Sequence, residues 1–226
     1  MDEIDNRPLI PIPTVKRFPS YLRILKQNKA AGMTYISATT LAEELGLKPI
    51  QVRKDISCTG IEGKPKVGFE IVELIDSITH VLGWDNSSDA LIVGAGNMGK
   101  ALAQYQGFEN YGLKIVAIFD KNPEKIGQKC GNLTILPIDS INQYIKMHRI
   151  AIAVITVPAS SAQSVADLLV KCGIRAIWNF APKDLKLPEE VVMQRTDLAT
   201  SFAVLSIKLR KKYGALAENE YSDEEI

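Results

Sequence analysis

Three glycines at a fixed spacing are the residues of this sequence that point most directly to a ligand. Gly94, Gly96 and Gly99 occur in the run VGAGNMG, directly after the apolar stretch ALIV. In such a GxGxxG turn the first glycine makes a tight turn, the second lets the backbone approach a pyrophosphate, and the third lets a helix pack on a strand. The N-terminus of that helix offers free N–H groups to phosphate oxygens. The same turn contributes further predicted contacts from Ala95, Asn97 and Met98.

An acidic residue follows the glycines at the distance typical of dinucleotide sites. Asp120 ends the apolar run KIVAIFD, 21 residues after Gly99, and Lys121 adjoins it in the predicted contact set. A carboxylate at this place accepts hydrogen bonds from the adenosine ribose hydroxyls and repels the additional phosphate of NADP. We therefore expect NAD, both as NADH and as NAD⁺, to be the cofactor.

Two later loops are expected to hold the nicotinamide half of the ligand, because ligands of parallel sheets lie outside the carboxyl ends of the strands. The predicted contacts are Thr156, Val157 and Pro158 in the first loop and Asn179, Phe180 and Ala181 in the second. Neither loop contains a His, Lys or Tyr that could act as a proton donor. This argues against a dehydrogenase, and no catalytic residue is expected.

The elements that must position these residues alternate between strands and helices. Apolar runs predict strands at 90–94, 114–120, 134–137, 150–158, 175–180 and 191–194, with helical stretches such as 161–173 between them. This order predicts an α/β fold, a doubly wound Rossmann sheet covered on both faces. The run at 197–213 is amphipathic, and its periodicity fits either packing on its own domain or insertion into a partner.

Upstream of residue 84 the pattern predicts a helix-turn-helix. A first helix is expected at 16–31, a second capped by Ser37 and ended by Gly46, and a third with Pro49 in its first turn. Because Val52 and Ile56 would face inward, the predicted outward side chains are Gln51, Lys54 and Asp55, with Arg53 on the flank. Residues 61–72 are expected to form a wing of two strands around a basic turn with Lys64 and Lys66, and residues 71–82 an amphipathic helix.

The charge distribution separates this N-terminal region from the rest of the chain. From Arg7 to Phe69 there are eleven basic and four acidic side chains, a net charge of +7, whereas the whole chain carries only +1. Such a surface is typical of a polyanion partner, and double-stranded DNA contacted by Gln51, Arg53, Lys54, Lys64 and Lys66 fits it. A solvated basic surface on a helical hairpin that binds nothing is the competing interpretation.

The composition excludes several other classes of protein. With 226 residues, 46% of them hydrophobic, the chain is long enough for two small soluble domains. No apolar run approaches the roughly 20 residues needed to span a bilayer, and the acidic start MDEIDNRPLI is unlike a signal peptide, so a cytoplasmic location is expected. The cysteines and histidines are few and widely separated, and we expect neither disulfides nor a metal site.

Taken together, the motifs resemble the Rex family of redox-sensing transcriptional repressors over almost the whole chain, up to about Tyr213. The runs that carry the resemblance are YLRIL, QVRKDIS, VGAGNMGKALAQYQGF, IFDKNPEKIG, ITVPASSAQSVADLLVKCGI and NFAP, followed by TDL near the end. The chain departs from the family's wing pattern, YFGxFGxRGxGY. Cys58 and Thr59 replace two aromatic residues, and Pro65 and Lys66 stand where Arg-Gly is expected.

The resemblance implies a homodimer with swapped C-terminal helices that NADH releases from palindromic operators. It also implies a switch in which Asp197 alternates between Arg23 of a partner subunit and Tyr105. The expected organisation is a winged-helix DNA-binding domain at 1–83, a hinge at 84–88, a Rossmann NAD(H)-binding domain at 89–196, a dimerisation helix at 197–213 and an acidic tail at 214–226.

Two alternatives come from other classes of protein. A small NAD-dependent oxidoreductase would leave the basic N-terminal domain and the missing acid–base pair unexplained. A CoA-binding domain, like that in the alpha subunit of succinyl-CoA synthetase, has a similar Rossmann beginning, but Asp120 disfavours it.

Overall fold

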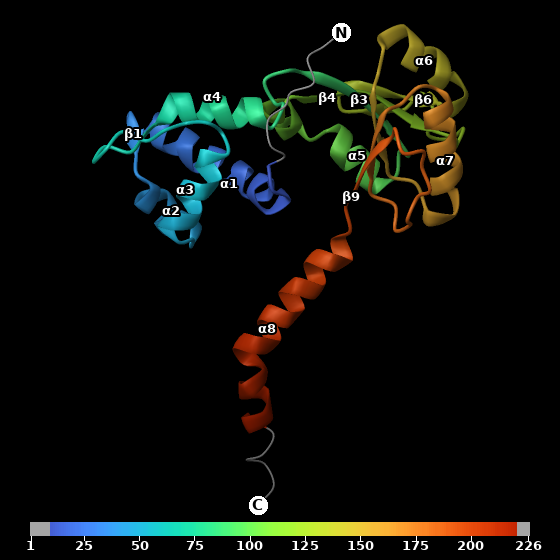
Figure 1. The fold of residues 1–226 in the computed structure, drawn as a ribbon. Coiled ribbons are helices and arrows are strands. Elements are labelled where there is room, and N and C mark those ends of the chain that lie inside the picture. The colour runs from blue at the N-terminus through green and yellow to red at the C-terminus, as the bar shows by residue number, and fades with distance from the viewer. Residues whose placement is uncertain (1–9, 221–226) are drawn as a thin grey trace, which may run out of the picture. The chain divides into compact units, whose positions relative to one another are not determined.

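The structure, a computed structural model, describes residues 10–220, and side chains through residue 214. It divides into two compact units (Figure 1): the first runs to Ser87 and includes Glu109–Gly112, and the second comprises Ser88–Phe108 and the chain from Leu113 onward. Arg7 of the predicted basic surface lies outside the described residues, as do Asp223, Glu224 and Glu225 of the predicted acidic tail.

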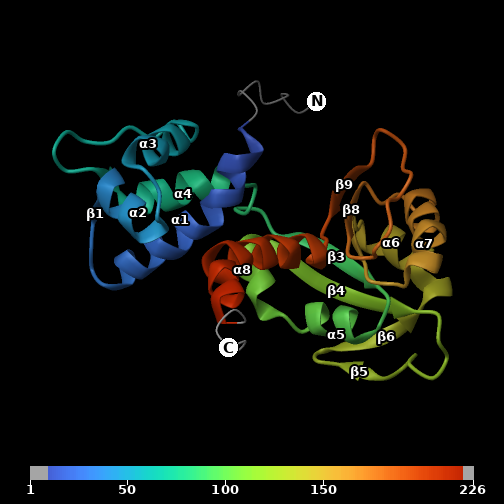
Figure 2. The same cartoon turned by 90° about the horizontal axis from the view of Figure 1, so that it is seen from below.

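The first unit, here called the head, contains four α-helices within the residues that the structure describes. They are α1 (Ile12–Ala30), α2 (Ala38–Leu45), α3 (Pro49–Ser57) and α4 (Ile71–Val81). Figures 1 and 2 both show α4 lying along α1, and their apolar side chains share one core with those of α2 and α3. The predicted boundaries of α2 and the predicted start of α3 are confirmed: Ser37 Oγ accepts from the Thr40 N–H at 3.0 Å, Gly46 ends α2 in a left-handed conformation, and Pro49 starts α3.

Asp55 on α3 corrects the sequence-based prediction, which placed it outward. It is only 1% exposed, because four side chains surround its carboxylate. Thr14 Oγ1 donates at 2.9 Å, Arg17 Nε and Nη2 both at 2.6 Å, Tyr21 Oη at 2.8 Å and Gln51 Nε2 at 3.0 Å. Asp55 therefore ties the second helix of the helix-turn-helix to α1.

These contacts decide the protonation states in the cluster. Burial disfavours the Asp55 carboxylate, but the hydrogen bonds from Arg17, Tyr21, Gln51 and Thr14 outweigh it, so the pKa of Asp55 lies below its ordinary value. Burial and the hydrogen bond to Asp55 raise the pKa of Tyr21, so its hydroxyl remains a donor.

The predicted wing is shorter than a two-stranded ribbon. β2 (Phe69–Glu70) pairs antiparallel with β1 (Tyr35–Ile36), and the turn before it is closed by a bridge between Lys64 and Gly68. Gly68 is required there, because a Cβ would lie 2.3 Å from the carbonyl oxygen of Ile36. The basic turn is present, but its second strand pairs with β1, and the expected first strand is reduced to that one bridge.

The second unit is built on a seven-stranded sheet in the order β5-β6-β4-β3-β7-β8-β9. The strands are β3 (Ser88–Val93), β4 (Leu113–Asp120), β5 (Lys129–Cys130), β6 (Leu133–Pro137), β7 (Ile152–Ile155), β8 (Ala176–Asn179) and β9 (Val192–Arg195). The six predicted strands are confirmed, all parallel in doubly wound Rossmann order, and β5 adds an unpredicted antiparallel edge.

Helices cover the two faces of this sheet. α6 (Ile141–His148) and α7 (Ala159–Lys171) share a core with one face, as Figure 1 shows, and α5 (Asn97–Ala103) packs on the other. Two short 3₁₀ turns, η1 (Gln106–Tyr111) and η2 (Ile138–Ser140), follow α5 and β6. Because β3 and β7 are adjacent and their helices cover opposite faces, the sheet has its topological switch point between them.

The last helix, α8 (Leu198–Glu220), carries a row of exposed apolar side chains. Leu198, Phe202, Leu205 and Leu209 are each 58% or more exposed. Contiguous apolar surface of this kind marks an interaction site in a folded protein.

We predict that Asp55→Ala destabilises the head by about 3–5 kcal/mol, because it leaves the Arg17 guanidinium and its neighbours without their acceptor. Since the pKa of Asp55 is lowered on folding, its stabilisation is present above about pH 4, the ordinary carboxyl value, and is lost as pH falls through the folded-state pKa. Chemical denaturation between pH 7 and pH 3 measures both effects. Exposed Asp76→Ala is the control, expected within about 0.5 kcal/mol of the parent; an equal loss in both variants would contradict the role given to Asp55.

Candidate functional site

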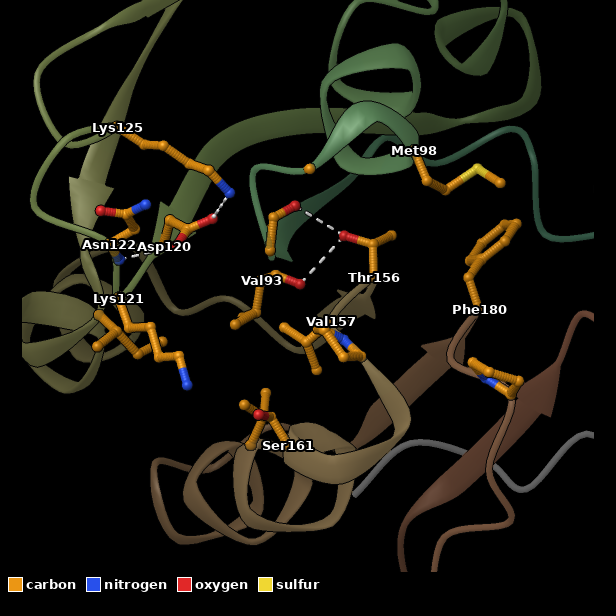
Figure 3. Close-up of a pocket in the computed structure, with 16 residues that line it drawn as sticks. Val93, Met98, Asp120, Lys121, Asn122, Lys125, Thr156, Val157, Ser161 and Phe180 are labelled. Atoms are coloured by element: carbon orange, nitrogen blue, oxygen red, sulfur yellow. Dashed lines mark hydrogen bonds and ion pairs between the residues drawn. The ribbon is translucent and has the colours of Figure 1, made fainter.

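A cavity of about 620 Å³ lies at the carboxyl ends of β3, β4 and β7 (Figure 3), a size suited to a small-molecule ligand. Most of the predicted cofactor residues line it: Gly94, Gly96, Met98, Asp120, Lys121, Thr156, Val157, Pro158 and Phe180. The loops that follow four separate strands, β3, β4, β7 and β8, thus converge on one pocket.

Close packing shapes the floor of the pocket, where β3, α5 and β7 meet. Thr156 Oγ1 donates to the carbonyl oxygen of Gly94 at 2.8 Å and lies 3.2 Å from that of Val93, as Figure 3 shows. A Cβ on Gly99 would lie 1.8 Å from the Gly94 oxygen, and one on Gly94, which has φ 109°, would lie 2.9 Å from Thr156. Neither position has room for a side chain.

Gly96 differs from these two glycines. It caps α5 with an extended backbone, and an added Cβ would meet nothing within 4 Å. Gly96 lines the cavity, so the space above it is open to a ligand. Gly94 and Gly99 are therefore required for close packing within the protein. At Gly96 the absence of a side chain instead lets a ligand approach the backbone.

The carboxylate of Asp120 stands at one end of the cavity (Figure 3). It accepts hydrogen bonds from the N–H groups of Ala95 at 2.7 Å and Asn122 at 2.9 Å, and Lys125 Nζ lies 3.1 Å from Oδ2. Burial opposes ionisation, but these donors outweigh it and hold the pKa of Asp120 below its ordinary value. Asp120 is therefore an ionised acceptor that also fixes the glycine turn through Ala95.

The remaining predicted cofactor residues are not part of the cavity wall: Ala95, Asn97, Gly99, Asn179 and Ala181. Asn179 is fully buried; its oxygen accepts from the Ala181 N–H at 2.9 Å and its amide donates to the Lys183 carbonyl at 2.8 Å. It shapes the loop that presents Phe180 and Pro182 to the cavity.

Several wall residues were not predicted from the sequence. They are Val93, Asn122, Lys125, Ile138, Ser161 and Val165, whereas Pro182 ends the second of the two predicted loops. Lys125 stands five residues beyond Asp120, so its reach back to that carboxylate depends on the turn between them. The wall as described holds no His, Cys or Tyr, and no group of three His, Cys, Asp or Glu in residues 10–220 is arranged to hold a metal ion.

On the head, the predicted DNA-facing residues divide by exposure. Arg53, Lys54, Lys64 and Lys66 are exposed, whereas Gln51 is half-buried with its amide nitrogen on Asp55. Because a carboxylate only accepts hydrogen bonds, this contact fixes which end of the Gln51 amide turns inward. Lys66 stands where the family's wing pattern has glycine, and its backbone is left-handed, with φ 64°. The turn therefore keeps the conformation that favours glycine, although a lysine rarely adopts it.

The three predicted switch residues lie in different surroundings. Arg23 is exposed on α1, and Tyr105 is 53% exposed with its ring 4.9 Å from that of Phe108. Asp197 precedes α8, where Oδ1 accepts from the Ala199 N–H at 2.9 Å and Oδ2 accepts from Arg195 at 2.9 Å. Arg195 also binds Asp184, so Asp197 has an ion-pair partner within its own chain.

Comparison with known proteins adds independent findings. Residues 85–183 match the family model described as CoA binding domain, and residues 9–57 match that of a putative DNA-binding protein N-terminus. The redox-sensing transcriptional repressor Rex of Treponema denticola is 44% identical over 200 residues, which cover 88% of this chain and 95% of the relative. The Rex repressor of Clostridium beijerinckii is 41% identical over 196 residues, covering 87% and 93%.

Solved structures agree with these relatives. The crystal structure of RSP in complex with β-NAD⁺ and operator DNA has a TM-score of 0.84 and 32% identity, and covers 96% of this chain and 100% of that chain. The structure of RSP with β-NADH has a TM-score of 0.81 and 33% identity, covering 91% and 96%. RSP itself is described as a Rex-family repressor.

The contrast between Gly96 and Gly99 gives a test of the pocket. Gly96→Val places a side chain in the open cavity, so we expect dinucleotide affinity to fall by about tenfold or more, 1.4 kcal/mol, with little change in the unfolding temperature. Gly99→Val forces a Cβ against the Gly94 carbonyl and should instead unfold the domain. Calorimetry and thermal melting measure the two effects; full affinity in folded Gly96→Val protein would place the ligand elsewhere.

Proposed function

The chain belongs to the Rex family of redox-sensing transcriptional repressors, and we propose that it binds operator DNA as a homodimer and is released from it by NADH. The observation that carries the proposal is the presence in one chain of a basic helix-turn-helix head and a Rossmann pocket with an ionised Asp120. A solved relative that matches 96% of this chain binds both β-NAD⁺ and operator DNA.

NAD(H) fits the residues of the pocket. The open backbone at Gly96 suits the pyrophosphate, and Asp120 suits the adenosine ribose hydroxyls. Thr156, Val157 and Phe180 would lie toward the nicotinamide. When bound, the nicotinamide supplies the redox signal, because its ring is cationic in NAD⁺ and neutral in NADH.

For the head, we propose that α3 enters the major groove of double-stranded DNA. Arg53 and Lys54 are exposed on α3 and free to reach base edges or phosphates, and Lys64 and Lys66 extend the basic surface onto the wing. Lys64 Nζ also donates to Tyr35 Oη at 2.9 Å, which directs its side chain over β1.

We assign the chain to the five segments expected from its sequence: 1–83 for DNA binding, 84–88 as hinge, 89–196 for NAD(H), 197–213 for dimerisation and 214–226 as an acidic tail. The exposed apolar row on α8 supports dimerisation, since a second copy of this chain would bury it. No helix in the described part of the chain is long and apolar enough to cross a membrane. We propose a cytoplasmic location, where operator DNA is accessible.

The switch is proposed to act through Asp197. In the DNA-bound state it would pair with Arg23 of the partner subunit, and in the NADH state with Tyr105. The exposure of Arg23 and Tyr105 supports their availability for these contacts.

We infer that the protein has no catalytic activity of its own. The charged side chains of the cavity wall are Asp120, held ionised by three donors, and Lys121 and Lys125, which all lie at or just after the end of β4, where we place the adenosine ribose. The segments after β7 and β8, where we place the nicotinamide, add only the small hydroxyls of Thr156 and Ser161, so no acid–base pair stands beside that ring. The match to the CoA binding domain model reflects the shared Rossmann beginning, and Asp120 favours the ribose of NAD(H) over CoA.

The test of this function is DNA binding to the protein's own promoter fragments at varied salt, with NAD⁺ or NADH titrated in. We expect affinity to fall steeply with salt and NADH to release the DNA. Arg53→Ala and Lys54→Ala should each weaken binding by about 1–3 kcal/mol where the contact is to a base. Exposed Lys146→Ala, in the other unit, is the matched control. A DNA affinity that changes neither with salt concentration nor with added NADH would refute the proposal.

The switch makes separate predictions for its members. Tyr105→Phe should retain NADH binding but respond less to it, because the hydroxyl that would donate a hydrogen bond to the Asp197 carboxylate is gone. Arg23→Ala should weaken DNA binding even without NADH. Fluorescence anisotropy with labelled operator and calorimetry with NADH distinguish the two; if both variants respond as the parent does, these residues do not form the switch.

A further inference from the structure

Trp178, on β8, contacts both Phe180, a wall residue of the cofactor pocket, and the segment that leads into α8. Its side chain is half-buried on the sheet face that α5 covers. Trp178 makes two kinds of contact: its rings pack against other aromatic rings, and its indole N–H donates a hydrogen bond.

The ring contacts reach the pocket and the region of Tyr105. The Trp178 and Phe180 ring centroids are 4.9 Å apart, and Phe180 lines the cavity, as Figure 3 shows. On another side Phe108 packs edge-on against Trp178 at 5.7 Å, and Tyr105 packs edge-on against Phe108 at 4.9 Å. The four rings form a continuous row from the cavity wall to Tyr105.

The indole N–H reaches a different segment. Trp178 Nε1 donates to Thr196 Oγ1 at 2.7 Å, and the Thr196 N–H donates to the Asn179 carbonyl at 2.9 Å. Thr196 directly precedes Asp197, whose carboxylate caps the first turn of α8. A tilt of the indole therefore breaks or remakes a hydrogen bond next to the start of α8.

We propose that Trp178 is the positioning residue that couples the redox state of the cofactor to the Thr196–Asp197 segment. The inference rests on the proposed function and adds to it the route from the pocket. A cationic ring is attracted to an aromatic face and a neutral one is not, so Phe180 is a wall residue that senses the difference between NAD⁺ and NADH. Because packed rings have little free volume, a shift of Phe180 moves Trp178 with it.

The test compares variants that remove this one hydrogen bond from either end. Trp178→Phe keeps an aromatic ring and loses the N–H, and Thr196→Val keeps the shape and loses the acceptor. The matched control is Tyr144→Phe, which removes the hydrogen bond from a ring hydroxyl to the Val116 carbonyl at 3.1 Å in the same unit, outside the cavity wall. For each variant, operator affinity is measured with saturating NAD⁺ and with saturating NADH, and cofactor affinity by calorimetry.

In Trp178→Phe and in Thr196→Val we expect the ratio of the two operator affinities to fall by about three- to tenfold per subunit, the worth of one net hydrogen bond. Because both subunits of the proposed dimer lose this bond, the ratio should fall by about ten- to hundredfold in all. The double variant should fall no further than either single one, because both remove the same contact. Tyr144→Phe should keep the parent ratio. A thermal-unfolding cycle on the cofactor-free variants should show the same non-additivity for the Trp178–Thr196 pair.

An unchanged ratio in both single variants, or an equal fall in Tyr144→Phe, overturns the role of Trp178 while leaving the NADH-sensing function intact. A parent ratio of one overturns the proposed function, and this inference with it. If Trp178→Phe does not fold, Thr196→Val alone decides, since its substitution preserves shape.

Discussion

The approach of α5 to the ends of β3 and β7 is the constraint on which the ligand site depends. With a Gly99 Cβ only 1.8 Å from the Gly94 oxygen, no other residue lets the helix start so close to the sheet. Thr156 locks the same junction with its hydrogen bond to Gly94, and Asp120 locks it from the other side through the Ala95 N–H. The turn is thus rigid before any ligand arrives, which keeps the backbone at Gly96 open without an ordering cost on binding.

The sequence predicted what is local in this site and missed what depends on tertiary structure. The glycine spacing and the acid at the end of the next strand belong to short segments, so Gly94, Gly96 and Asp120 were identifiable. Lys125 and Ser161 reach the cavity only because a turn and a helix start happen to face it. Asn179 was expected to face the ligand, but the loop after β8 needs its side chain for internal hydrogen bonds.

Asp55 was predicted to face outward because it is charged, although its spacing along the helix indicates the buried face. It lies three residues after Val52 and directly before Ile56, so helical geometry puts it on or beside the buried face. A charged residue is seldom buried unless paired, and its partners Arg17 and Tyr21 lie on α1, more than 30 residues away in sequence. The sequence-based prediction made the wing too long for a similar reason. The strand that pairs with β2 is β1, which precedes α2 and therefore lies far from the wing in the sequence.

The free energy needed to release the operator can be compared with what the Trp178–Thr196 contact and α8 can each contribute. To empty an operator from about 99:1 to 1:99, NADH must favour the released state by roughly 10⁴-fold, about 5.5 kcal/mol. One net hydrogen bond supplies about 0.5–1.5 kcal/mol, and two symmetry-related ones in a dimer no more than about 3 kcal/mol. Reburying a single Leu or Phe side chain is worth about 1.5–3 kcal/mol, and α8 exposes several of them. In the proposed dimer, where a second copy buries the apolar face of α8, a shift of that interface that buried one or two further apolar side chains in the released state would make up the difference. The contact between Trp178 and Thr196 would then act as a trigger for that shift.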